Sequence, residues 1–160
     1  MRIFKEEQAF RQWGLIAILG TTLIGSTLSI IYKYRKSDPI NYEFLGFGII
    51  VLVILIICVL RLHTRIDANG IKTRFEPVGY FRKEFKWSEI NQCYVRKYSP
   101  WSEYGGWGIR VFRKAKAYNV SGNMGIQIIT KDKKKFLIGT NKPEEARKVI
   151  RRYQEKLNRT

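Results

Sequence analysis

Residues 44–60 read FLGFGIIVLVILIICVL, a run of 17 residues without a charge, an amide or a proline. Because this run has no polar face, it does not fit an amphipathic helix that lies on a soluble core. A bilayer span needs about 20 apolar residues. Arg61 can extend the run by snorkelling its guanidinium to the headgroups, which would add Leu62 to the span. We therefore predict a membrane-spanning helix over residues 44–61, with a buried core helix as the alternative.

A second apolar run lies upstream, in residues 13–32, which contain no Asp, Glu, Lys, Arg or His. A helix of this length spans about 30 Å, the hydrocarbon thickness of a bilayer. A signal peptide is the alternative, but no small-x-small cleavage site precedes Lys33. Residues 33–43 then connect the two runs, with Asp38-Pro39 as a turn signal. We predict a transmembrane helical hairpin, preceded in residues 1–12 by a short charged tail at the membrane interface.

Positive charge near the ends of the two runs predicts the orientation of this hairpin. The connecting segment carries three basic residues, Lys33, Arg35 and Lys36. The opposite side carries seven, namely Arg2, Lys5, Arg11, Arg61, Arg65, Lys72 and Arg74. Since basic residues favour the cytoplasmic side, we expect an integral membrane protein with both termini in the cytoplasm.

From residue 62 onward the apolar pattern has a period of two, which is typical of strands. Asn69-Gly70 lies between two alternating runs and predicts a hairpin turn. About seven short strands follow one another, the last two over residues 124–130 and 135–139 with a polar turn between them, so residues 62–160 are expected to form an antiparallel sandwich or small barrel. Trp87 ends one alternating run and is predicted to be a core residue.

The chain ends in a predicted helix over residues 142–157. Asn141 and Glu144 have the spacing of a capping box. Residues at spacings of three and four form one apolar stripe that would plug an open end of the barrel: Ala146, Val149, Ile150, Tyr153 and Leu157. The predicted fold class is thus α+β: a membrane anchor in residues 1–61, followed by a β domain capped by a helix.

Several motifs resemble those of bacterial pleckstrin-homology-like membrane proteins, a family of small and largely uncharacterised proteins. They are WSEI at residues 87–90, AYNVSGNMG at 117–125, FLIGT at 136–140 and KPEE at 142–145. The resemblance covers most of residues 1–157. It implies seven strands in two packed sheets with a C-terminal helix, in a bacterial cell membrane, and it implies no established activity.

The charge of the chain predicts an anionic partner. The net charge is +17, and residues 61–160 hold 24 of the 30 Lys and Arg but only 9 of the 13 acids. Four basic residues follow the second run within 14 positions, and we expect them to contact anionic lipid: Arg61, Arg65, Lys72 and Arg74. The first alternative is that these basic residues form a solvated surface that serves solubility. A membrane-tethered nucleic-acid-binding protein is the second, although the aromatic residues alternate as core residues and no nucleic-acid motif occurs.

Aromatic residues are also concentrated in residues 99–107, SPWSEYGGW. Trp101 and Tyr104 are the candidates for contact with a protein partner, whose identity the sequence does not indicate. The alternative is that this segment folds back over one end of the barrel.

Enzyme signatures are not found. His63 is the only histidine, and with Cys93 it supplies too few ligands for zinc. The glycine-rich residues 105–108 and 121–125 do not continue into the Gly-Lys-Ser/Thr of a phosphate-binding loop. We therefore expect no catalytic residue, no metal and no cofactor, and a binding or scaffolding module rather than an enzyme.

Overall fold

A computed structural model of the chain describes residues 3–36, 41–77, 79–112 and 115–157. It divides into two compact units. Residues 10–60 form one unit, the apolar hairpin. Residues 61–160, together with the segment that ends at Ala9, form the other unit, the β domain. The predicted turn at Asp38-Pro39 lies outside the described residues.

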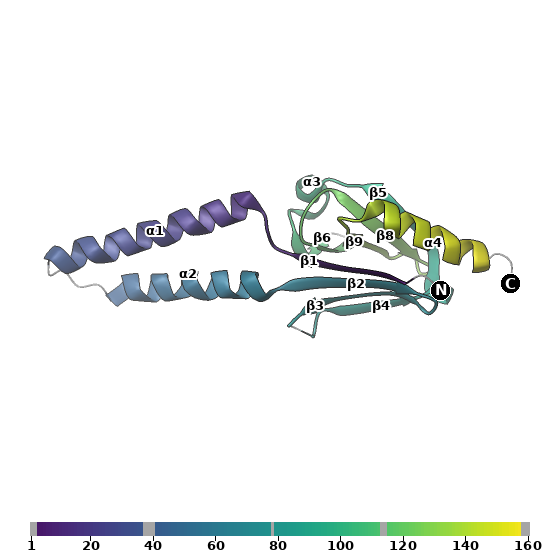
Figure 1. The fold of residues 1–160 in the computed structure, drawn as a ribbon, viewed down its shortest axis with the longest axis horizontal. Helices are drawn as coiled ribbons and strands as arrows, with labels where there is room; N and C mark the ends of the chain where they lie inside the picture. Colours follow the sequence, from purple (N-terminus) through teal and green to yellow (C-terminus); the bar gives the residue numbers. More distant parts are fainter. Residues whose placement is uncertain (1–2, 37–40, 78, 113–114, 158–160) are drawn as a thin grey trace. The chain divides into compact units, whose positions relative to one another are not determined.

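The apolar hairpin consists of the helices α1 (Trp13–Lys36) and α2 (Asn41–Val59) (Figure 1). Both are long and apolar enough to cross a membrane, and neither is buried by protein. The threonine hydroxyls in α1 are satisfied within the helix, since Thr21 and Thr22 donate to backbone carbonyls three and four residues earlier and Thr27 to one four residues earlier. Lys33 and Glu43 form an ion pair between the two helices. The two predicted runs are thus helices, and α2 ends before Arg61.

The β domain is built on two sheets. Among the described residues, the first sheet has the strand order β1-β2-β3-β4 and the second has the order β5-β8-β9-β7-β6. The first sheet is formed by β1 (Phe4–Ala9), β2 (Arg61–Asp67), β3 (Gly70–Glu76) and β4 (Arg82–Lys86). The second is formed by β5 (Ile90–Lys97), β6 (Gly108–Phe112), β7 (Ala115–Asn119), β8 (Met124–Thr130) and β9 (Lys135–Gly139). Short helical segments complete the domain: η1 (Trp87–Glu89), α3 (Pro100–Tyr104) and the longer α4 (Pro143–Leu157).

The sheets correct the predicted seven-stranded antiparallel arrangement in two ways. The described residues contain nine strands, because β1 precedes the apolar hairpin and β6 and β7 are two separate paired strands. Strand β7 also pairs with β9 in parallel, with Ala115 opposite Lys135. Antiparallel pairing holds for the other neighbours, and the predicted Asn69-Gly70 turn connects β2 and β3.

The N-terminal segment also differs from the prediction, because residues 4–9 form a strand rather than an interfacial tail. β1 pairs with β2 along its whole length, from Phe4 opposite Ile66 to Ala9 opposite Arg61. Phe4 is buried in the β domain. Leu62, which was expected to lengthen the second apolar helix, is fully buried in β2. The apolar hairpin therefore ends before Arg61, where the strand period begins, and residues 4–9 belong to the β domain.

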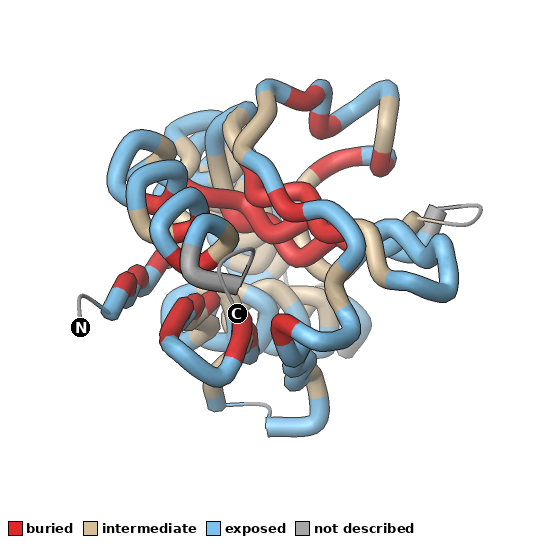
Figure 2. The backbone as a smooth tube through the Cα atoms, turned by 90° about the vertical axis from the view of Figure 1, so that its right-hand side faces the viewer, coloured by how far each residue is buried: buried red, intermediate tan, exposed pale blue. Residues whose placement is uncertain are grey.

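The core lies between the two sheets, and a chain of aromatic rings connects them. Phe75 contacts Tyr118, Tyr118 contacts Phe136, and Phe136 contacts Phe85, with ring centroids 5.0–5.5 Å apart. Figure 2 shows the buried residues, in red, gathered inside the domain. Trp87 is confirmed as a core residue.

Helix α4 packs on this core through its apolar stripe, as predicted. Ala146, Ile150 and Tyr153 are buried, and the Tyr153 ring lies 5.5 Å from that of Trp87. The side chain of Leu157 lies outside the described residues. Tyr153 is thus confirmed in the core together with Trp87, and the helix covers one part of the sandwich.

The start of α4 differs from the predicted capping box. The Asn141 side chain bonds to Ser121 and the Glu144 carboxylate to Arg147, so neither caps the helix. Instead, the Thr140 hydroxyl accepts from the backbone N–H of Lys142 (3.1 Å). Glu6, from β1, accepts from the Thr140 hydroxyl (2.6 Å) and from the backbone N–H of Asn141 (2.7 Å). The N-terminal strand therefore supplies the polar groups that hold the start of the C-terminal helix.

Candidate anion-binding face of the first sheet

Strand alternation separates the two faces of the first sheet. In β1 and β2 the residues Phe4, Glu6, Leu62 and Ile66 point inward and are buried. The residues between them point outward, and register aligns them into rows across the strands. One row is Lys5, Arg65, Lys72 and Glu84, and the next is Glu7, His63, Arg74 and Arg82.

We call six of the outward basic side chains of this sheet the basic face: Lys5, Arg61, Arg65, Lys72, Arg74 and Arg82. An open groove of about 540 Å³ runs over it. The groove is lined by Lys5, Glu6, Glu7, His63, Thr64, Arg65, Lys72, Thr73, Arg74 and Arg82. Three of the four residues predicted to contact anionic lipid therefore line one groove. The fourth, Arg61, lies at the end of the same face, opposite Glu76.

Acidic side chains on the same face neutralise part of this charge. Ion pairs join Lys72 to Glu84 (2.6 Å), Arg74 to Glu76 (2.6 Å), Arg65 to Asp67 (2.9 Å) and Arg61 to Glu7 (3.6 Å). The hydrogen bond from Lys72 lowers the pKa of Glu84, so that carboxylate is ionised at neutral pH. Six basic residues face four acids, which leaves an excess of two positive charges. Lys5 has no acidic partner among the described residues.

His63 lies in the middle of the basic face rather than free in solvent. Its Nε2 atom is 2.9 Å from the Glu76 carboxylate, and its Nδ1 atom is 4.0 Å from that of Glu7. Within the described residues, no three His, Cys, Asp or Glu side chains are grouped so that they could hold a metal ion. The histidine is therefore part of the charge network of the sheet.

Sequence reasoning missed two members of the basic face, Lys5 and Arg82. The sequence of β1, FKEEQA, contains a single large apolar residue, so its inward positions Glu6 and Gln8 give no hydrophobic alternation. Arg82 begins an edge strand that is exposed on nearly every residue. The signal that would have located Lys5 is the pairing of β1 with β2, which no local pattern reveals.

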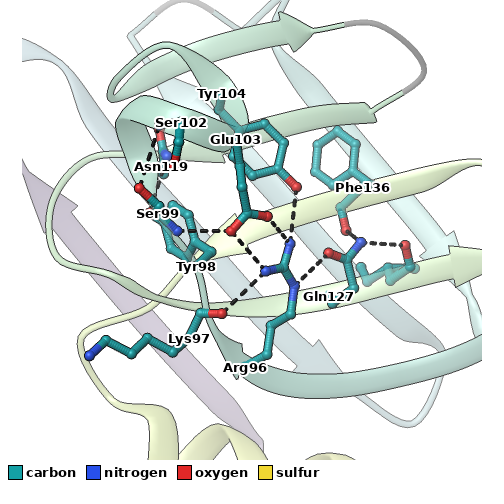
Figure 3. A network of polar contacts seen from close by, with 11 residues as sticks. Arg96, Lys97, Tyr98, Ser99, Ser102, Glu103, Tyr104, Asn119, Gln127 and Phe136 are labelled. Atoms are coloured by element: carbon teal, nitrogen blue, oxygen red, sulfur yellow. Dashed lines mark hydrogen bonds and ion pairs between the residues drawn. The ribbon is translucent and has the colours of Figure 1, made fainter.

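The second sheet carries a different groove, of about 620 Å³, beside α3. There the Arg96 guanidinium donates to both carboxylate oxygens of Glu103 (2.6 and 3.1 Å) and to the Gln127 side chain (3.1 Å) (Figure 3). The hydrogen bonds with Glu103 raise the pKa of Arg96, and the same bonds lower the pKa of Glu103. This pair fixes α3 against the outer face of the sheet.

The two aromatic residues predicted to contact a partner separate in this region. Tyr104 is buried, and its ring packs against Tyr98 at 6.0 Å, so it is not available on the surface. Trp101 is 68% exposed. The alternative therefore holds for one side of the short helix, which folds over the sheet, while contact of the exposed Trp101 with a partner stays a prediction.

Comparison with known proteins gives no family. A scan against protein-family models found no match, and a search of curated proteins found none either.

Proposed function

We propose that this chain is a membrane-anchored binding module that holds the headgroup phosphates of anionic lipids on its basic face. In this proposal α1 and α2 span the cell membrane, and both termini lie in the cytoplasm. The β domain is pleckstrin-homology-like: two packed sheets with a C-terminal helix support that part, while the nine described strands and the parallel β7–β9 pair depart from the seven-stranded pattern.

The observation that carries the proposal is the open groove on the basic face. Its positive excess attracts anions, and a leaflet rich in anionic lipid is the nearest polyanion to a membrane-anchored domain. A basic residue held near such a surface contributes about 1 kcal/mol. The ion pairs do not block this role, because an arginine has five donors. Arg74 can therefore keep its bond to Glu76 and still donate to a phosphate.

The short connection between α2 and β2 supports a position of the basic face close to the bilayer. Only Leu60 separates α2 from Arg61, the first residue of β2. Successive rows are two residues apart along a strand, about 7 Å. Since the leaflet potential decays over about 8 Å in physiological salt, the rows of Arg61 and Arg74 should contribute more than the row of Lys72.

Lysine footprinting of the full-length chain in lipid nanodiscs tests the proposal. An amine-reactive reagent should modify Lys5 and Lys72 more slowly in nanodiscs that contain phosphatidylglycerol than in pure phosphatidylcholine, and the difference should shrink as salt rises. Lys133, in the turn between β8 and β9, and Lys135, in β9, are the internal controls and should react equally in both lipids. Equal reactivity of Lys5 and Lys72 in the two lipids would reject the proposal.

A charge-reversal pair adds an independent test. The variant Lys72→Glu/Arg74→Glu should retain fewer phosphatidylglycerol molecules after purification than the matched control Lys133→Glu/Lys135→Glu, which has the same net charge. If both variants lose lipid equally, net charge rather than the basic face governs binding. Titration of the same samples with duplex DNA examines the nucleic-acid alternative.

A further inference from the structure

Exposed aromatic residues are concentrated at one end of the β domain. The apolar hairpin is inserted between Ala9 and Arg61, which are register partners in β1 and β2. Arg61 is in turn opposite Glu76, the last residue of β3. We call this side of the domain the insertion end. The opposite end contains the β2–β3 turn, where the Trp87 indole donates to the Asp67 carbonyl.

The strand ends of the second sheet can be assigned to the same two ends of the domain from hydrogen bonds between the two sheets. At the insertion end, the Gln8 side chain donates to the carbonyl of Gly139, the last residue of β9 (2.7 Å). Gly139 is opposite Gly125 in β8, next to the end of β5. The segment after β5, which contains α3, therefore lies at the insertion end (Figure 1). The β8–β9 turn lies at the opposite end, where the Lys131 amide donates to Glu89.

Two large aromatic side chains at the insertion end are mostly exposed. Tyr80, in the turn between β3 and β4, is 90% exposed, and its ring contacts only the neighbouring Phe81 ring among the described aromatic residues. Trp101, in α3, is 68% exposed. Both therefore present amphipathic rings to whatever adjoins this end of the domain.

Trp101 is held in place, and its polar group is available. Its ring packs edge-on against Trp107 at 5.5 Å. The Trp107 indole already donates to the Gly122 carbonyl (3.1 Å), and Arg110 donates to the Trp107 carbonyl (2.9 Å). In the part of the chain that the structure describes, the Trp101 indole N–H has no hydrogen-bond partner. A rigid ring with an unused donor suits an environment that is apolar on one side and polar on the other.

We propose that Tyr80 and Trp101 rest in the interfacial layer of the bilayer that α1 and α2 cross, and so orient the β domain on the membrane. Trp and Tyr concentrate at membrane–water interfaces because their rings sit at headgroup level. Residues 10–12 connect β1 to α1, and Leu60 connects α2 to β2, so both chain connections to the helices leave the insertion end. This inference rests on the proposed membrane spans, but not on the binding of anionic lipid, because aromatic insertion needs no lipid charge.

Fluorescence quenching in full-length protein tests the inference. The chain is reconstituted into phosphatidylcholine vesicles that contain phosphatidylcholine with a nitroxide on its headgroup. In the variant Trp13→Phe, the nitroxide should quench a large part of the tryptophan emission. Removal of Trp101 and Trp107 as well, in the variant Trp13→Phe/Trp101→Phe/Trp107→Phe, should abolish most of this quenching, because the remaining Trp87 is buried. Quenching that is unchanged by the loss of both tryptophans would overturn the proposal.

A new tryptophan at either end of the domain makes the test specific. In that last background, Tyr80→Trp should restore quenching, whereas Lys131→Trp, at the opposite end, should not. Equal quenching of the two would show that the domain has no preferred orientation. Blue-shifted emission of Trp87 reports that each variant is folded. Quenching of Trp13 in the variant Trp101→Phe/Trp107→Phe reports the spans separately: if Trp13 is quenched and Trp101 is not, the anchor is supported and only the aromatic contact fails.

Discussion

The two sheets of the β domain differ in how the chain supplies their strands and in what covers their outer faces. The second sheet is continuous in sequence, from Ile90 to Gly139, whereas the first takes β1 from before the apolar hairpin and β2–β4 from after it. The outer face of the first sheet is a lattice of charged side chains. That of the second is partly covered by α3, which one arginine–carboxylate pair holds in place. The β domain is therefore not a module appended after the apolar hairpin, because the hairpin is inserted between two of its paired strands.

The largest expected effect follows from this insertion. Deletion of residues 3–9 removes a whole strand, exposes the edge of β2 and leaves the start of α4 without Glu6. We expect the β domain of that variant to lose cooperative unfolding, as monitored by near-UV circular dichroism of the full chain in detergent. A domain that melts as the wild type does would show that β1 is dispensable.

The converse variant provides the control. Because Ala9 and Arg61 are antiparallel neighbours, replacement of residues 10–60 by Asn-Gly should close β1 and β2 into an ordinary hairpin. We expect a water-soluble, folded domain. Residues 61–160 expressed alone lack β1 and should aggregate.

The second largest effect concerns the core that both sheets share. Trp87 is buried, donates to the Asp67 carbonyl of the first sheet and packs against Tyr153 of α4. Trp87→Ala should destabilise the domain by about 3–5 kcal/mol. Trp101→Ala is the matched control, since Trp101 is exposed, and thermal unfolding should shift little. If the melting temperature of Trp87→Ala falls as little as that of Trp101→Ala, Trp87 lies outside the cooperative core.

The sequence predicted the second sheet better than the first, for a physical reason. Met124–Thr130 and Lys135–Gly139 were predicted at the observed bounds, because each strand is apolar and a polar turn separates them. β1 was missed, since its inward residues Glu6 and Gln8 are polar, and the Glu6 carboxylate and the Gln8 amide nitrogen bond to groups more than 130 residues away. Pairing at that separation is a property of the folded chain, and no local period encodes it.

The same limit applies to the candidate site. The alternation of apolar and polar residues with a period of two was sufficient to place Arg65, Lys72 and Arg74 on one face, and these three residues line one groove. Their acidic partners depend on cross-strand register, as with Lys72 and Glu84, so the extent of neutralisation was not predictable. Tyr104 is buried because Arg96 and Glu103 fix α3, and that pair joins two separate elements.

The third effect is a polar contact between the ends of the chain. Glu6→Ala leaves the Thr140 hydroxyl and the Asn141 N–H without their acceptor, which should cost about 1–3 kcal/mol. Glu6→Gln keeps an acceptor oxygen and should cost less. If Glu6→Ala melts at the wild-type temperature, the carboxylate does not hold the start of α4.

The pH dependence of stability identifies the charge of Glu6. Burial raises the pKa of Glu6 above its ordinary value of 4.5, and the hydrogen bonds from Thr140 and Asn141 only partly oppose this rise. Above pH 4.5 the folded domain therefore holds a proton that the unfolded chain releases. The contribution of Glu6 to stability is full below that pH and is lost as pH rises through the folded pKa. Melting curves of wild type and Glu6→Gln should diverge over this interval.

The smallest effect concerns the ion pair between Arg96 and Glu103, which holds α3 on the outer face of the second sheet. Arg96→Met removes the partner of Glu103 and should loosen α3, while the strands beneath keep their ladder hydrogen bonds. We expect a modest fall in melting temperature, because both side chains are partly exposed. Hydrogen exchange should rise mainly in residues 100–104. Lys133→Met, beside the same groove, is the control and should leave α3 unchanged.

Acidic pH should remove the difference in melting temperature between wild type and Arg96→Met. The pH dependence of this contribution is opposite in sign to that of Glu6. Hydrogen bonds from Arg96 lower the pKa of Glu103, so the unfolded chain binds a proton there before the folded domain does. The stability that this pair supplies is present above pH 4.5 and is lost as pH falls through the folded pKa of Glu103. The melting curves of wild type and Arg96→Met should therefore converge in acid. A gap that persists at low pH would mean that Arg96 acts through its bonds to Gln127 and the Lys97 carbonyl rather than through its charge.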